Sequence, residues 1–112
     1  MSTSPEFRSF VLEQLGRVVP VTSRSMFGGV GIYSGGLFFA LMDGDSLYLK
    51  VDDGNRPAFE RIGSRPFQPY DDERTMQYYE LPTDILEDVD ELREWVEGAV
   101  AVAGRARARR KR

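Results

Sequence analysis

The residues that most clearly could form a binding site are five glycines in residues 24–36. This segment reads RSMFGGVGIYSGG. Glycine clusters bind phosphates when they lie between a strand and a helix, because the helix N-terminus then faces the phosphate. Here residues 29–34 read GVGIYS, so the last glycine of a dinucleotide-binding loop is missing. Sequence typical of a strand follows, and no Lys-Ser/Thr pair completes a P-loop. We therefore predict that these glycines shape strands and turns, and we expect no bound cofactor.

The sequence offers few groups for catalysis. It contains no cysteine and no histidine, which excludes disulfides, thiolate nucleophiles and the commonest general base at neutral pH. Lys50 is the only lysine before the C-terminal segment, so a Schiff base has a single candidate there. We expect a protein that is not an enzyme, and we keep a carboxylate-dependent enzyme as the less favoured alternative.

Three acidic clusters raise the question of a metal site. They lie at Asp43 and Asp45, at Asp52 and Asp53, and at residues 71–73. A calcium-binding loop needs regularly spaced oxygen ligands, but leucines follow the first cluster where such ligands should stand. We predict that the first two clusters are turns and that the third is a solvated loop, and we expect no metal site.

Charge is distributed very unevenly along the chain. Residues 1–103, the acidic body, hold nine basic and all 18 acidic residues, whereas residues 104–112, the basic tail, read GRARARRKR. Such a tail can bind nucleic-acid phosphates by releasing counterions, or can contact an acidic partner. A solvated end, or a continuation of the last helix with arginines suiting the helix dipole, remains an alternative. The candidate contacts are Arg105, Arg107, Arg109, Arg110, Lys111 and Arg112.

Three further residues are candidate contacts with a protein partner. Arg24, on an expected strand, can bind a phosphate or an acidic partner, but pairing with an acid on a neighbouring strand is favoured. Lys50 alternates with Leu49 and Val51, which predicts a solvated surface lysine. Tyr78 and Tyr79 should point to opposite faces of a strand, with one in the core and the other, taken here as Tyr79, exposed at an interface.

The pattern of apolar residues predicts the elements that position these side chains. Ser4 followed by Pro5 is typical of a helix start. The expected order is α-β-β-β-β-α-β-α, which forms an α+β two-layer domain with an antiparallel sheet flanked by helices. The domain spans residues 1–103 and the tail spans 104–112. The expected helices are 5–15, 55–62 and 88–104, and the expected strands are 21–27, 30–33, 37–42, 47–51 and 75–81, with a short turn after Thr83.

Three segments together resemble a known family. Residues 24–29 read RSMFGG, residues 47–50 read LYLK and residues 78–82 read YYELP. In this order they resemble the N-terminal domain of the TfoX/Sxy proteins, and the resemblance covers roughly residues 7–103. It implies a secretion-chaperone-like α+β fold and kinship with regulators of natural competence, which act at promoters with the cyclic-AMP receptor protein. It also implies no enzymatic activity, although full-length members carry a second, helical domain where this sequence continues into the basic tail.

These observations lead to one expected function and its alternatives. We expect a non-enzymatic regulatory or protein-interaction domain whose partner is a protein, with a transcription regulator or a second copy of the chain both open. The alternative is a nucleic-acid-associated protein that binds through the basic tail. No run approaches the roughly 20 apolar residues of a membrane helix. The N-terminus also lacks the basic start and apolar block of a secretory signal, so we expect a cytoplasmic protein without a membrane partner.

Overall fold

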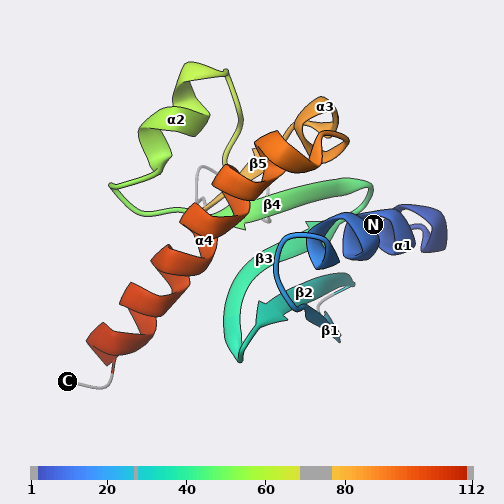
Figure 1. The fold of residues 1–112 in the computed structure, drawn as a ribbon, viewed down its shortest axis with the longest axis horizontal. Coiled ribbons are helices and arrows are strands. Elements are labelled where there is room, and N and C mark those ends of the chain that lie inside the picture. The colour runs from blue at the N-terminus through green and yellow to red at the C-terminus, as the bar shows by residue number, and fades with distance from the viewer. Residues whose placement is uncertain (1–2, 27, 69–76, 111–112) are drawn as a thin grey trace.

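The computed structural model describes residues 3–26, 28–68 and 77–110. It shows a five-stranded antiparallel sheet in which the strands follow one another in chain order, with helices packed on it (Figure 1). This confirms the predicted α+β class and element order, to which the structure adds a short helix before the last one. The elements are α1 (Pro5–Gly16), β1 (Thr22–Met26), β2 (Gly29–Ser34), β3 (Leu37–Asp43), β4 (Ser46–Lys50), α2 (Arg56–Arg61), β5 (Tyr78–Leu81), α3 (Thr83–Leu86) and α4 (Val89–Arg110).

Local sequence explains how the first helix begins and how it is held. Pro5 occupies the first turn of α1, and the Ser4 hydroxyl accepts a hydrogen bond from the Phe7 backbone amide at 3.2 Å, as a helix cap does. At the other end of the helix, the buried Gln14 side chain donates to the Leu86 carbonyl at 2.8 Å. This bond satisfies a buried amide and fastens α1 to α3.

The glycines have the structural role that the sequence predicts. Gly35 and Gly36, with φ of 56° and 81°, form the turn between β2 and β3. Gly29 and Gly31 lie inside β2, which runs into that turn and not into a helix. A Cβ at Gly31 would lie 2.6 Å from the Met26 methyl and 3.3 Å from the Phe38 ring, so large side chains do lie against this position. Close packing of strands and side chains therefore accounts for the glycines.

The sheet has one face buried under helices and one face that no described helix packs against. The helix-covered face carries Ile32, Met42, Leu47 and Leu49, which join one core with the buried apolar residues of α1, α2 and α3 and most of those of α4. The alternating residues of the same strands point to the opposite side, here called the open face. Leu41 and Tyr78 are buried on the open face but do not belong to that core. The open face is lined by Arg24, Met26, Tyr33, Phe38, Leu41, Tyr48, Lys50 and Tyr78.

Two element boundaries differ from the sequence prediction by more than one residue. The last helix was expected to end near residue 104, but α4 continues to Arg110, so residues 104–110 of the basic tail are helical. Alternating alanines and arginines favour helix, and no glycine or proline follows Gly104 to end it. The last strand, expected from residue 75, begins at Tyr78, because the backbone bends at Gln77, and residues 75 and 76 lie outside the described residues. Among the helices described, none is long and apolar enough to cross a membrane.

Candidate functional site

The turn between β4 and α2 is fastened by its own side chains. Asp52 Oδ1 accepts from the Gly54 backbone amide at 2.8 Å, and Asn55 Oδ1 accepts from the Asp52 backbone amide at 2.9 Å. The Asn55 amide nitrogen also donates to the Lys50 carbonyl at 3.1 Å. Asn55 directly precedes α2, but its side chain makes no capping hydrogen bond with the helix, because it bonds within the turn instead. These bonds hold the turn so that the second oxygen of Asp52 faces α4.

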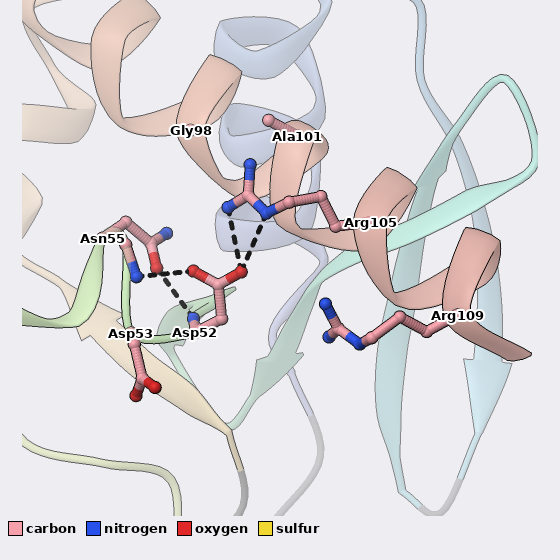
Figure 2. Close-up of a pocket in the computed structure, with 8 residues that line it drawn as sticks. Asp52, Asp53, Asn55, Gly98, Ala101, Arg105 and Arg109 are labelled. Carbon is pink, nitrogen blue, oxygen red and sulfur yellow. Dashed lines mark hydrogen bonds and ion pairs between the residues drawn. The ribbon is translucent and has the colours of Figure 1, made fainter.

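Arg105 of α4 binds the second oxygen of Asp52, Oδ2, through an ion pair. Its Nε and Nη2 atoms donate to Asp52 Oδ2 at 3.0 and 2.9 Å, which joins the turn to the last third of the helix (Figure 2). Burial alone would raise the pKa of Asp52, but the bond from Gly54 and the charge of Arg105 outweigh it, so the pKa lies below its ordinary value. Asp52 was predicted only as a turn residue, and the structure adds this ion pair across 53 positions of sequence.

The ion pair lies in an open cleft of about 610 Å³ between the β4–α2 turn and α4. The backbone of Gly54 and the small residues Gly98 and Ala101 leave room for it. Arg109, one helical turn beyond Arg105, lies at the same cleft (Figure 2). Asp53, also at the cleft, pairs with Arg56 at 2.7 Å. The cleft therefore has arginines on its helical side and two carboxylates on the other, each of them in an ion pair.

The structure places most of the basic tail at the exposed end of α4. Arg105, Arg107, Arg109 and Arg110 are all exposed there, and Arg107 Nη1 lies 3.6 Å from the position of a Cβ on Gly36 in the β2–β3 turn. Within the part of the chain that the structure describes, Arg107, Arg109 and Arg110 form no ion pair. Lys111 and Arg112 lie outside the described residues. The four described arginines are thus brought together by one helix.

Lys50 differs from its prediction as a solvated lysine. Its side chain is half-buried on the open face, with Nζ 3.4 Å from the Tyr78 hydroxyl and 5.0 Å from the centre of the Tyr78 ring. Burial, with repulsion from Arg110 and Arg109, lowers the pKa of Lys50. Burial, together with the nearby Tyr33, raises the pKa of Tyr78 to about 12. Tyr78 is directly opposite Lys50 in the sheet, which explains why the lysine lies over its ring.

Aromatic rings line the open face beside this lysine. Tyr33 and Phe38 stack with ring centres 5.0 Å apart, and Phe38 meets Tyr78 at 5.7 Å. Tyr48 meets Phe67 at 4.8 Å. The sequence does not indicate that these rings form one surface, because a register shift at Ile32 and Tyr33 changes which residues of β2 and β3 face the same side. Alternation along each strand predicts such groupings only when no bulge intervenes.

Arg24 and Tyr79, the other predicted partner contacts, have different outcomes. Arg24 is exposed on the open face opposite Gly31, and within the described residues no carboxylate pairs with it, so the favoured cross-strand pair is not found. Tyr79 lies on the other side of β5, where it is half-buried against Phe59 and its hydroxyl is 3.4 Å from Glu60. Tyr78 and Tyr79 do face opposite sides as predicted, but Tyr79 is no exposed anchor. Of the three predicted partner contacts, Arg24 and Lys50 therefore lie on the open face, and Tyr79 does not.

The acidic clusters can be placed in part. Asp43 and Asp45 flank the β3–β4 turn, and Asp52 and Asp53 form the β4–α2 turn, in agreement with the turns predicted. The third cluster, residues 71–73, lies outside the described residues. In the described ranges, no three carboxylate, cysteine or histidine side chains gather as metal ligands do.

The fold and these surfaces define an α+β domain whose notable features are a sheet face lined with aromatic rings and a basic helix end. The TfoX N-terminal domain family matches residues 13–103, so the chain belongs to that family. TfoX N-terminal domains are a non-catalytic domain family. None of the curated proteins matches this chain.

Proposed function

We propose that this protein is a non-enzymatic regulatory domain that works in the cytoplasm by binding a protein partner on the open face of its sheet. The observation that carries the proposal is the row of contacting rings, Tyr33, Phe38 and Tyr78, on a sheet face that no described helix packs against. Family membership supports a non-catalytic role. The resemblance to TfoX/Sxy proteins adds a transcription regulator as the class of partner.

The composition of the open face suits a protein interface. Protein interfaces are enriched in aromatic residues, methionine and arginine, and their strongest contacts gather around rigid aromatic anchors. The half-buried rings of Tyr33 and Phe38 already stack on each other, and Phe38 packs against the buried Tyr78. Binding would therefore cost little side-chain entropy at these rings. Arg24, exposed in the same face, adds a residue type that often anchors interfaces.

Charge along the open face would orient the partner. Lys50 lies at one end of the face, near Arg109 and Arg110 of α4. Glu80 lies toward the other end, where its carboxylate accepts from the Ser46 hydroxyl at 3.0 Å. A partner with an acidic patch at one end and a basic patch at the other fits this arrangement, because complementary charges fix register and suppress wrong partners.

Substitution of the stacked rings tests the proposal. We would capture partners from lysate of the native cells with the intact chain, identify the enriched protein, and measure its affinity in purified form by calorimetry. The double variant Tyr33→Ala/Phe38→Ala should weaken that binding by at least about tenfold, the loss of one strong anchor. Ile62→Ala is the matched control, because Ile62 is a large exposed apolar residue outside the open face, 44% exposed.

The same variants separate the remaining possibilities. If the ring variant stays folded and binds the purified partner as tightly as the intact chain, the open face is not the interface and the proposal fails. If sedimentation shows a dimer that only the ring variant abolishes, the partner is a second copy of the chain. If purified protein turns over a phosphoester, ester or peptide and Asp52→Asn removes that turnover, the domain is an enzyme and the non-enzymatic assignment is overturned.

A further inference from the structure

The end of α4 presents a second surface, which adjoins the open face at Lys50 and Tyr78. Figure 1 shows the last turns of α4 extending past the edge of the sheet. Arg107, Arg109 and Arg110 lie on these turns, and all three are exposed. The acidic body would repel an approaching polyanion, but the extension carries these arginines away from much of that charge. This separation makes the helix end, and not the domain as a whole, the place where a polyanion can be bound.

This basic end is held in position by the fold. The two hydrogen bonds from Arg105 to Asp52 fix the helix against the β4–α2 turn just before the three arginines. Arg109 follows Arg105 by one turn and lies at the same cleft (Figure 2). Arg107 lies elsewhere on the helix, beside Gly36 of the β2–β3 turn. The helix therefore holds the backbone of these arginines in a fixed arrangement, so no backbone entropy is lost when their side chains bind a ligand.

Among the described residues, the carboxylates near this end form their ion pairs with other arginines, so they offset its positive charge only in part. Asp52 forms an ion pair with Arg105, and Asp53 forms one with Arg56. Within the described ranges, Arg107, Arg109 and Arg110 have no ion-pair partner. Lys50 lies close enough to Arg109 and Arg110 for their repulsion to contribute to its lowered pKa. A group of cations that have no ion-pair partner within the described residues is stabilised most by an external anion that carries several negative charges.

We propose that the end of α4 binds the phosphodiester backbone of a nucleic acid through Arg107, Arg109 and Arg110. Guanidinium groups match phosphate oxygens with paired hydrogen bonds. Arg107 and Arg110, three residues apart, lie on one side of the helix and Arg109 lies on another, and this spread fits a continuous chain of phosphates better than a single anion in a pocket. Contacts with phosphates carry no sequence information, so the binding should be independent of sequence and sensitive to salt. This places nucleic acid next to the protein partner of the proposed function without relying on that function.

Fluorescence anisotropy with the full chain tests the proposal. The probes are labelled duplex DNA, labelled single-stranded RNA and a labelled polyglutamate peptide. Three phosphate contacts on a duplex predict a slope of log affinity against log salt of about −2.7, or about a 40-fold loss between 50 and 200 mM salt. The same contacts on a single strand predict a slope of about −2.1, so the two nucleic-acid forms can be told apart. The triple variant Arg107→Gln/Arg109→Gln/Arg110→Gln should lose at least about tenfold in affinity at 50 mM salt.

A charge-matched control keeps the result interpretable. The triple variant Arg17→Gln/Arg61→Gln/Arg93→Gln removes the same charge from exposed positions away from this end. It should retain the affinity of the intact chain within about twofold, and circular dichroism should show both variants folded. Equal losses in both variants, or no loss in the α4 variant, would refute the proposal. Tighter binding of polyglutamate than of either nucleic acid would also refute it, and would make the end of α4 a contact for an acidic protein segment.

Discussion

The guanidinium of Arg105 donates two hydrogen bonds to a single oxygen of Asp52, from Nε at 3.0 Å and from Nη2 at 2.9 Å. An exposed ion pair alone contributes little to stability, because water and salt screen it. Asp52 also makes a second interaction, because its other oxygen, Oδ1, accepts a hydrogen bond from the Gly54 backbone amide at 2.8 Å. Asp52 therefore links two things at once, the local conformation of the β4–α2 turn and the position of the helix end.

We expect the two partners of this pair to differ in their effect on stability. Asp52→Ala should lower the free energy of unfolding by about 1–2 kcal/mol, because it removes the turn hydrogen bond as well as the ion pair. Arg105→Ala should cost about 0.5–1 kcal/mol, because only the exposed pair is lost. Urea unfolding of both single variants and the double variant measures this. A coupling free energy indistinguishable from zero would contradict the pairing.

The contribution of Asp52 should also depend on pH. Its pKa is lowered in the folded state, so the unfolded chain binds the proton more readily and stability is lost as the pH falls. The contribution is complete above the ordinary aspartate pKa of 3.8 and disappears as the pH falls through the lower folded value. We expect the stability difference between the intact chain and Asp52→Asn to shrink over that window. A difference that stays constant from neutral pH to below that window would show that the carboxylate charge is not stabilised by the fold.

Gly29 and Gly31 should respond differently to the addition of a methyl group. A Cβ at Gly29 would overlap the backbone carbonyl of Met42 in the neighbouring strand, which cannot move without disturbing the sheet. A Cβ at Gly31 would meet the mobile end of the Met26 side chain at 2.6 Å and the Phe38 ring at 3.3 Å. We expect Gly29→Ala to cost about 2–3 kcal/mol and Gly31→Ala about 1 kcal/mol or less. Urea unfolding that reverses this order would contradict the strand packing described.

Much of the fold could be predicted from sequence because its signals are local. Ser4 and Pro5 mark the start of α1, and the paired glycines at 35 and 36 mark a turn, whatever the rest of the chain does. The end of α4 was harder to predict. The arginine-rich segment is polar on all sides, and its helical form is supported in part by the distant Asp52, which sequence proximity does not reveal.

The candidate site shows the same limit more strongly. Sequence analysis selected the arginines of the tail by composition, and the structure gathers four of them on one helix. It did not identify Tyr33 and Phe38 as a stacked pair, because their register depends on the β-bulge in the β2–β3 pair. The sequence predicts a solvated Lys50, because alternation along a strand shows which side of the sheet a side chain faces but not which neighbours it contacts there. The ring of Tyr78 comes from a strand 28 residues away.

Titration of Lys50 tests the geometry that joins the open face to the end of α4. Burial, with repulsion from Arg110 and Arg109, holds the pKa of Lys50 below the ordinary value of 10.5. The unfolded chain then binds the proton more readily between the two values, so stability should rise as the pH rises through that window. Reductive methylation with carbon-13 gives Lys50 its own NMR signal for the titration. We expect Arg109→Gln/Arg110→Gln to raise the measured pKa toward 10.5, while Arg17→Gln/Arg93→Gln, with the same loss of charge at exposed positions elsewhere, leaves it nearly unchanged. An equal rise in both variants would mean that Lys50 senses only the net charge of the protein, and no rise in either would place the arginines too far away to act on it.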